Sequence, residues 1–510
     1  MKTMLLPLLL LAQAIQVAAQ QPAYVITAFG AKADGKTNNT AAIQQAIDKA
    51  SAAGGGQVLV PAGKFVTGVI TLKSGTNLHL AANAYLLGST RRTDYGMGKA
   101  SALIVADGQQ HISITGPGTI DGQGEELLED IYTVLKNGTI KDNEWQQYND
   151  WGQMRPAENN RPKLIAFNNC RDITIKNITI KNGLCWIQDY RSCTDMIFDS
   201  LTVHSNAFLN NDGIDLVDCK NVQLTNSFFD VADDGICLKS HDPKGACENI
   251  YIANCKVRSS ASAFKMGTAS FGGFKHITVK DLFVYNTFRS AIAIETVDGG
   301  IIEDINIQNV TADNTGNAIF IRLGKRRAQI APGKLSNIYI GNVKVSIPAG
   351  KPDAGYPMEG PRELFEHNIF PSSITGIPGY AVNDITLENI DITYNGNALK
   401  QVANRNADSL QNIQEHIADY PEFSMFGELP AWGLYVRHAG GITLKNVNLH
   451  YTGKEFRTAC IFDDVTGLQL KQVQVTKAAS LPLLILNKVK NPVLEQLQLP
   501  APEQQAVLIR

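Results

Sequence analysis

A short pattern of alternating apolar residues that recurs along the chain limits the fold more than any other feature. Each copy reads apolar, any, apolar, two mostly polar residues, apolar, any, apolar, as in "DITIKNITI" from Asp172. Further copies begin at Asp195, Asn221, Asn249, His276, Asp304, Asn337, Asp384 and Gly441. Up to Asp304 they start 23 to 28 residues apart, about one coil of a parallel β-helix. Period two, rather than 3.6, predicts strands. The sequence therefore predicts an all-β, right-handed parallel β-helix.

A second ladder of short apolar segments follows each first copy by about 14 residues, as in "GIDLV" from Gly213 and "GICLK" from Gly235. Alternation in a strand places successive side chains on opposite faces. The residues predicted to point inward are Ile187, Ile214, Leu216, Ile236, Leu238, Phe264, Met266, Ile292, Ile294, Ile319 and Ile321. Their outward neighbours are Trp186, Gln188, Asp215, Lys239, Lys265, Glu295 and Arg322. Charged and aromatic groups in line on a flat sheet favour a polymer-binding groove, and a merely solvated face is the alternative.

The two ends and three interruptions fit the same solenoid. Residues 40–50 carry Ile43, Ala46, Ile47 and Ala50 at helical spacing, which predicts an N-terminal helix that caps the first coil. The rhythm breaks near 122–161, 349–380 and 395–430, where polar and turn-forming residues predict loop insertions. Long insertions in repeat folds gather on the binding side, so we expect them to wall the groove. Surface loops without that role are the alternative.

Bulk properties restrict the partners and the compartment. A chain of 510 residues would suggest several domains, but a repeat fold allows one β-helix domain over 20–510. The net charge of -2 is unlike that of a nucleic-acid-binding protein. Residues 1–19 read as a signal peptide, with Lys2, an apolar run and small residues at the end. No later segment is apolar over roughly 20 residues, so we expect a protein exported to the periplasm or the extracellular space, with no membrane span, acting as a monomer.

Cysteine and histidine usage says less. Eight cysteines in an exported chain permit disulfides, for instance Cys185 with Cys193 or Cys247 with Cys255. Buried, reduced cysteines in core positions are the alternative. The chain has no Cys-x-x-Cys pair and its nine histidines are scattered, so we expect neither a metal site nor a cofactor.

Three aspartates stand where copies of the second ladder begin: Asp212 in "NNDGID", and Asp233 with Asp234 in "ADDGIC". Neighbouring coils lie about 4.8 Å apart, so the three carboxyl groups can converge above the sheet. Crowded like charges raise at least one pKa, which leaves a protonated acid beside a carboxylate base. Such a pair is typical of glycosidic hydrolysis. Asp before Gly is also a common turn dipeptide, but its occurrence on consecutive coils favours catalysis.

These segments resemble the polygalacturonase family, glycoside hydrolase family 28. The resemblance covers nearly the whole mature chain, through "FGAKADGKTNNTAAIQQAID", "GGGQVLVPAGKF", "GTIDGQG", "RPKLIAFNNC", "NNDGID" and "ADDGICLKS". The last two occupy the places of the family's Asn-Thr-Asp and Gly-Asp-Asp motifs. The resemblance implies inversion, with Asp233 as the general acid and with Asp212 and Asp234 positioning the attacking water.

Two family motifs are absent. The chain has Ser262 where members carry the histidine of Gly-His-Gly, and Ala293-Ile294-Glu295 where they carry Arg-Ile-Lys. The lost cations hold galacturonate carboxylates in members of the family, and Glu295 adds an anion. Lys265 and Lys239 could restore positive potential or pair with Glu295. We therefore expect a neutral or differently decorated sugar at the cleaved bond of a pectic polysaccharide or oligosaccharide, rather than plain polygalacturonan.

Two other functions fit the same sequence. Clustered aspartates on a parallel β-helix can hold Ca²⁺ in a polysaccharide lyase, for which Lys265 is the candidate base. The two lost motifs would also suit a carbohydrate-binding β-helix without catalytic activity. Loop walls that close one end of the groove would favour action at chain ends.

Overall fold

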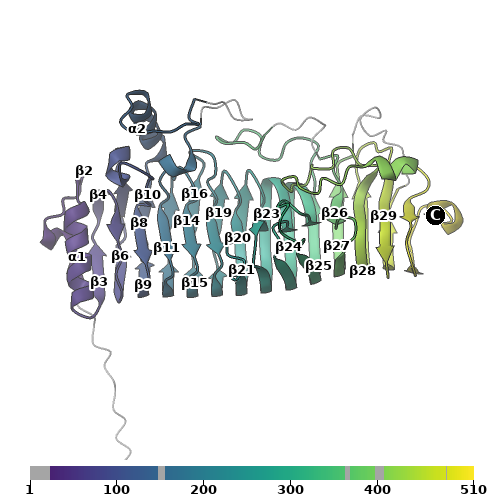
Figure 1. Cartoon of the computed structure of the whole chain (residues 1–510), viewed down its shortest axis with the longest axis horizontal. Coiled ribbons are helices and arrows are strands. Elements are labelled where there is room, and N and C mark those ends of the chain that lie inside the picture. Colours follow the sequence, from purple (N-terminus) through teal and green to yellow (C-terminus); the bar gives the residue numbers. More distant parts are fainter. Residues whose placement is uncertain (1–22, 147–154, 362–367, 397–406, 478) are drawn as a thin grey trace, which may run out of the picture.

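The computed structural model describes residues 23–146, 155–361, 368–396, 407–477 and 479–510. The predicted signal peptide at 1–19 lies outside these residues. The described chain is an elongated solenoid in which strands of successive coils lie side by side along the long axis (Figure 1). None of its described helices has the length and apolar composition needed to span a bilayer. The predicted parallel β-helix is confirmed.

Three parallel sheets run along the solenoid. The first contains β1 Ala23–Val25, β3 Gly56–Val60, β6 Thr76–Leu80, β9 Gln110–Thr115, β12 Arg171–Lys176, β15 Thr194–Asp199, β18 Lys220–Thr225, β21 Cys247–Ser259, β23 Gly273–Thr296, β24 Ile301–Leu323, β25 Lys334–Ser346, β27 Val382–Tyr394, β28 Ala431–Tyr451, β30 Gln469–Val475 and β32 Val493–Glu495. The second contains β2 Asp34–Asn38, β4 Gly63–Thr67, β7 Ala84–Gly88, β10 Thr119–Asp121, β13 Thr179–Lys181, β16 Thr202–Ser205 and β19 Phe228–Val231 before it continues into β21.

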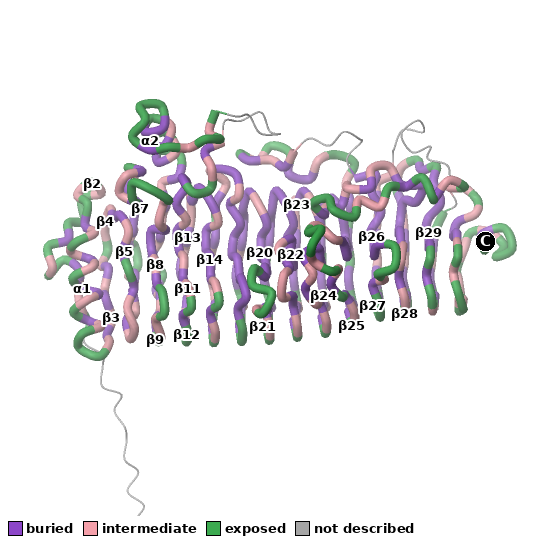
Figure 2. Tube along the Cα trace, viewed as in Figure 1, coloured by how far each residue is buried: buried purple, intermediate pink, exposed green. Residues whose placement is uncertain are grey.

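The third sheet is the predicted second ladder, and it carries the site. It contains β5 Ile70–Thr71, β8 Ile104–Asp107, β11 Ile165–Asn168, β14 Gln188–Arg191, β17 Ile214–Val217, β20 Ile236–Ser240 and β22 Phe264–Ser270, continues through the ends of β23 and β24, and resumes in β26 Ser372–Thr375, β28, β29 Thr458–Thr466, β31 Leu484–Asn487 and β33 Val507–Ile509. All inward residues predicted for this ladder are fully buried in the core. Figure 2 shows this burial continuing along the coils.

The occurrence of asparagine and aspartate at the start of the repeats has a structural reason. Asp172, Asn221 and Asn249 adopt positive φ values of 52°, 54° and 55°. Asn and Asp tolerate this left-handed conformation better than other side chains. The amide of Asn249 also donates to the side-chain oxygen of Asn221 on the previous coil over 3.1 Å. Stacked turn residues therefore keep consecutive coils in register.

Helices close the N-terminal end and cover one side. Helix α1 Thr40–Ala52 buries the four predicted residues completely against the first coils, which confirms the cap. The other helices are α2 Gly124–Lys136 and α3 Glu503–Ala506, with short 3-10 helices η1 Ile26–Phe29, η2 Arg92–Tyr95, η3 Glu158–Asn160 and η4 Ala407–Asn412. Figure 1 shows α1 at one end of the solenoid and α2 standing out from its upper edge.

All three predicted loop insertions contain some regular structure, and the one near 395–430 holds η4. The stretch near 122–161 holds α2, which buries Leu127, Ile131 and Leu135 at helical spacing. The many polar residues of that stretch led to the prediction of a loop, although three apolar residues at helical spacing lie within it. The stretch near 349–380 holds β26, whose Ile374 points inward as in the other strands of the third sheet. These elements show that the insertions are partly built into the solenoid.

The eight cysteines are all free and buried. The suggested disulfides Cys185–Cys193 and Cys247–Cys255 are therefore wrong for this structure. Burial raises the pKa of Cys255 to about 12 and of Cys247 to about 12, which keeps both thiols protonated at neutral pH. The cysteines fill core positions as small apolar side chains.

Candidate active site

A column of side chains crosses the coils at the entrance to the third sheet. Strand register places Lys163, Trp186, Asp212, Asp234 and Ser262 on successive coils. Backbone hydrogen bonds join the same positions, for instance from Gly213 N–H to the carbonyl of Asp234 over 2.9 Å. The repeat therefore brings Asp212 and Asp234 next to each other, as the sequence predicted.

Lysines hold the two aligned carboxylates. One oxygen of Asp212 and one of Asp234 lie within 4.8 Å of each other. The Nζ of Lys239 lies 2.9 Å from Asp212 Oδ2, and the Nζ of Lys265 lies 3.0 Å from Asp234 Oδ2. The backbone N–H of Ser262 donates to the other oxygen of Asp234 over 3.1 Å. Each carboxylate is thus fixed by a buried cation from a neighbouring strand.

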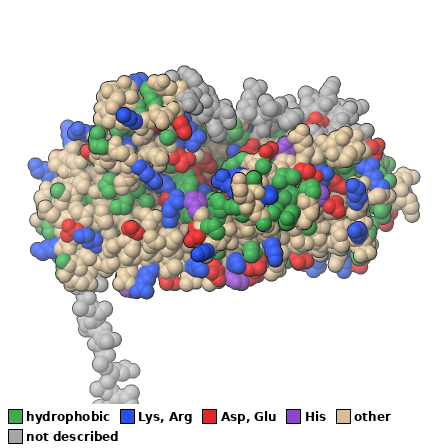
Figure 3. Space-filling view, viewed as in Figure 1, with side chains coloured by type: hydrophobic (Ala, Val, Ile, Leu, Met, Phe, Trp, Pro, Cys, Tyr) green, Lys and Arg blue, Asp and Glu red, His purple; other side chains and the backbone are tan. Residues whose placement is uncertain are grey.

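Asp233 lines a cavity of about 270 Å³. Its walls come from all three predicted insertions, through Arg155, Glu359 and Tyr420. Arg289, at the corner of β23, completes the lining. In Figure 3 the surface is hollowed between α2 and the loops of the C-terminal half, with acidic and basic side chains around the hollow. The structure thus supports the prediction that the insertions wall the groove.

The neighbouring aspartates have opposite pKa shifts. Burial, together with the charges of Asp212 and Asp234, raises the pKa of Asp233 to about 7. Burial also acts to raise the pKa of Asp234, but the positive charges of Lys265 and Lys239 outweigh it and lower that pKa. Near neutral pH a protonated Asp233 can therefore stand beside an ionised Asp234.

Asp212 shares its lysine with Asp215. The Nζ of Lys239 also donates to Asp215, which is fully buried on β17. Burial raises the pKa of Asp212, with the charge of Asp234 adding to it, although Lys239 acts in the opposite direction. Lys239 pairs with both Asp212 and Asp215, and this contact holds the carboxyl group of Asp212 beside Asp234. Asp215 and Lys239 therefore support the site from within the sheet.

The outward residues of the ladder are far less exposed than an open charged face requires. Gln188, Asp215, Lys239, Lys265, Glu295 and Arg322 are all buried, and Trp186 is half-buried. The interpretation of a flat open face is wrong here, because opposite charges pair across the coils and loops cover them. Lys265, for example, donates to the hydroxyl of Tyr420 over 3.0 Å. Burial raises the pKa of Glu295 to about 7 despite the nearby charge of Lys265.

Arg322 has a different role from the predicted one. Its guanidinium donates to the carbonyls of Gly376, Glu415 and His416 over 2.9, 2.7 and 3.2 Å. Only 1% of the residue is exposed. These contacts fix the third insertion against the sheet, which leaves Arg322 outside the set of residues that can reach a substrate.

Sequence reasoning missed Arg289 and Tyr420. The side chain of Arg289 is 16% exposed, lines the cavity with Asp233 and lies 3.1 Å from a carboxylate oxygen of Glu422. Its position four residues before Ala293, at the start of a ladder copy, was the available signal. Tyr420 comes from an irregular insertion, so no pattern in the sequence marked it.

The cluster offers poor ligands for calcium. Among the described residues, Asp212, Asp234 and Cys237 are the one group whose ligand atoms lie close enough together to share an ion. Ca²⁺ takes six to eight oxygen ligands, whereas this group has one thiol and two carboxylates already paired with lysines. The donor set does not fit the metal of a calcium-dependent lyase.

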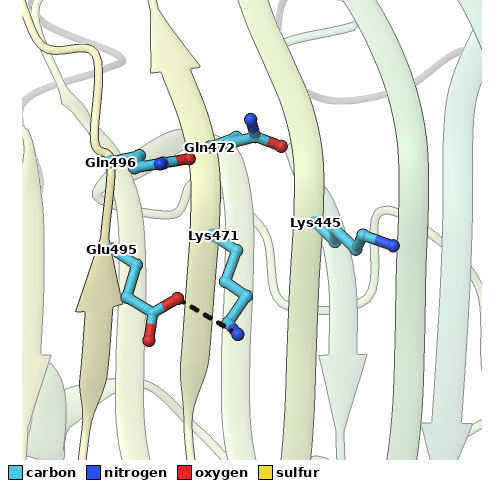
Figure 4. A pocket seen from close by; sticks show the side chains of 5 residues that line it. All are labelled: Lys445, Lys471, Gln472, Glu495 and Gln496. Atoms are coloured by element: carbon cyan, nitrogen blue, oxygen red, sulfur yellow. Dashed lines mark ion pairs between the residues drawn. The ribbon is translucent and has the colours of Figure 1, made fainter.

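A hollow of about 370 Å³ lies elsewhere, on the first sheet near the C-terminal end, between side chains of β28, β30 and β32 (Figure 4). Lys471 pairs with Glu495 over 3.0 Å, and Lys445 pairs with Glu388 over 2.6 Å. Its charges are matched within the sheet, and it is remote in the fold from the aspartates.

A parallel β-helix with clustered carboxyl groups beside a walled cavity is typical of proteins that act on polysaccharides. The profile described as "Glycosyl hydrolases family 28" matches residues 51–352. The chain belongs to glycosyl hydrolases family 28.

Individual relatives agree with this family. A probable polygalacturonase of Vitis vinifera is 28% identical over 312 residues, covering 56% of this chain and 59% of that protein. An exo-poly-alpha-D-galacturonosidase of Dickeya chrysanthemi is 29% identical over 302 residues, covering 50% and 49%. The chain thus matches about half to six-tenths of the length of these relatives. A solved exopolygalacturonase from Thermotoga maritima has the same fold, with a TM-score of 0.58, 21% identity and coverage of 73% and 87%.

Proposed function

We propose that the protein is an inverting glycoside hydrolase that cleaves a pectic polysaccharide or oligosaccharide. The observation that carries the proposal is the opposite pKa shift of two adjacent carboxyl groups, Asp233 raised to about 7 and Asp234 lowered. Asp233 also lines the cavity into which a substrate can enter. Family membership and the polygalacturonase names of the relatives support the substrate class.

In this proposal Asp233 donates its proton to the glycosidic oxygen as the bond from the anomeric carbon breaks. Asp234 accepts a proton from a water whose oxygen forms the new bond to that carbon, and Asp212 helps to position the water. One water is consumed and one new hemiacetal is formed. Lys265 keeps Asp234 ionised, so that it can act as the base.

Charge near the cleaved bond supports a neutral or differently decorated sugar there, rather than plain polygalacturonan. Lys265 pairs with Asp234 over 3.0 Å and Arg289 pairs with Glu422 over 3.1 Å. Both cations are therefore already neutralised, and Glu295 adds a titratable acid. A uronate carboxylate at this place would compete with existing ion pairs.

The insertions support action at chain ends. Glu359, Tyr420 and Arg289 lie beside Asp233 on the side of the later coils. A wall there limits how far a chain extends past the aspartates. The segment 1–19 supports export to the periplasm or the extracellular space, where such polymers occur.

A lyase fits less well. β-Elimination needs a base that removes a proton next to a carboxylate, and Lys265 was the candidate. Burial acts to lower the pKa of Lys265, but the charges of Asp234 and Tyr420 raise it well above its ordinary value. A permanently protonated ammonium cannot accept that proton.

The test is product analysis on polygalacturonan, rhamnogalacturonan and their oligosaccharides, with Asp233→Asn beside the wild type. Proton NMR at the first turnovers should show the anomeric configuration inverted, and Asp233→Asn should lose activity by about 10²–10⁴-fold. Release of single sugars or short units without a fall in viscosity would support end-wise action. An unsaturated product that absorbs in the ultraviolet would contradict hydrolysis.

A further inference from the structure

A second and larger pocket, of about 570 Å³, lies on the N-terminal side of the aspartates. Its floor is the outer face of β8, β11 and β14, where Val105, Ala166 and Asp189 stand in line. The segments around Lys99 and around 158–163 form its walls. The floor strands belong to regular coils of the solenoid, so the floor is held by the same parallel register as the column of Asp212 and Asp234.

The pocket has more positive than negative side chains. Lys163 lies 2.5 Å and Arg191 lies 2.9 Å from the same oxygen of Asp189. Two cations therefore share one carboxylate. Lys99, Arg161 and Glu158 also line the pocket, which gives four cationic and two anionic side chains in all. An ammonium carries three N–H donors, and this ion pair uses one of those of Lys163. The excess charge favours an anionic ligand.

The pocket also has a buried acceptor without a partner. Asp189 is 4% exposed, and no described group donates to its Oδ1. A buried carboxylate oxygen left without a donor is costly, and a hydroxyl of a ligand would satisfy it. Hydroxyl donors beside a carboxylate are what a sugar acid offers, whereas inorganic phosphate at neutral pH offers few.

Trp186 connects this pocket to the catalytic column. Its ring lies 4.0 Å from the Nζ of Lys163 and 4.2 Å from the Nζ of Lys239, measured to the ring centroid. Lys239 in turn binds Asp212. Lys163 precedes Asp212 by two coils in the column, roughly 10 Å at the usual strand spacing. A chain that reaches Asp212 can therefore continue over Trp186 into the pocket.

We propose that this pocket binds a uronic acid residue of the substrate chain, with its carboxylate at Lys163 and Arg191 and a hydroxyl at Asp189. The inference rests on the proposed function for its substrate class. It separates the acidic sugar from the cleaved bond, where Lys265 and Arg289 each pair with a carboxylate of their own, whereas Lys163 and Arg191 share one. Discrimination between acidic and neutral chains then arises on coils before the catalytic ones.

The experiment measures binding without turnover. The Asp233→Asn protein is titrated by calorimetry with tetragalacturonate and with its fully methyl-esterified form, which has the same chain without the charge. We expect the acid to bind about tenfold more tightly than the ester at low salt. Lys163→Gln in this background should weaken acid binding about tenfold and leave ester binding within about twofold.

Two controls keep the result interpretable. Lys163→Arg keeps the charge and should retain the preference for the acid, and a normal thermal transition shows that each variant folds. Lys220→Gln removes an exposed lysine from β18, on a different sheet, and should change neither affinity.

Equal binding of acid and ester, equal loss of both in Lys163→Gln, or no binding of either probe would overturn the proposal. Failure of the proposed function gives a different result. A wild-type protein that cleaves no glycan, while Asp233→Asn binds tetragalacturonate through Lys163, would remove the hydrolase and leave the uronate site.

Discussion

The two hollows of the groove differ in how they are built and in their charge. The cavity at Asp233 is walled by three insertions, and its cations Arg155 and Arg289 are held in ion pairs with Glu158 and Glu422. The pocket at Lys163 has its floor on regular coils and shares one carboxylate between two cations. The difference suggests that one place serves chemistry, where a balanced potential tunes pKa values, and the other serves recognition of charge.

The largest expected effect is the loss of the base. Asp234→Asn should lower kcat by about 10³–10⁴-fold, because the water loses its proton acceptor. Affinity for tetragalacturonate should hardly change, since Asp234 lies outside the charged pocket. Steady-state kinetics and calorimetry together test this. A large loss of affinity would show that the two hollows are not independent.

Removal of Lys265 should have the next largest effect. Lys265→Met takes away the main charge that lowers the pKa of Asp234, so this pKa should rise and more of the base should be protonated in acid. We expect kcat/KM to fall by about 10–100-fold at pH 5, and the acid limb of its pH profile to move to higher pH.

Lys265→Arg keeps the positive charge and is the matched control. Its acid limb should remain near that of the wild type. An unchanged limb in Lys265→Met would mean that Lys265 does not set the ionisation of Asp234.

A substitution of Arg322 tests whether this residue stabilises the fold or binds the substrate. Arg322→Met leaves the carbonyls of Gly376, Glu415 and His416 without their donor, which should lower the free energy of unfolding by about 2–4 kcal/mol. Activity should fall several-fold on acidic and neutral substrates alike. Thermal unfolding and kcat/KM on both substrate types measure this. A loss confined to acidic substrates would return Arg322 to the substrate-binding residues.

The smallest expected effect is a shift of the basic limb. The positive charge of Arg289 lowers the pKa of Asp233, which is about 7, so Arg289→Gln should raise this pKa. Asp233 then stays protonated to higher pH, and the basic limb of kcat/KM should move upward by less than about one pH unit. Arg289→Lys should retain the wild-type limb, and a downward shift in Arg289→Gln would contradict the assignment of Asp233 as the acid.

The positions of residues that the repeat aligns from coil to coil could be predicted from the sequence. Asp212 and Asp234 follow from period-two strands and a coil of fixed length, which also gave the inward core and the capping helix. The sequence could not show that the outward charges are buried, because burial depends on loops that arrive from distant insertions. Arg322 illustrates this, since its partners Glu415 and His416 lie more than 90 positions later in the chain.

The sequence by itself determined the solenoid, its register and the column of carboxyl groups, because each depends on local alternation repeated from coil to coil. The tertiary structure alone decided which side chains surround that column. Arg289 and Tyr420 reach Asp233, and Lys163 and Arg191 meet at Asp189, through contacts for which no local pattern exists. Such contacts set burial and ion pairing, and these set the protonation states on which the proposed reaction depends.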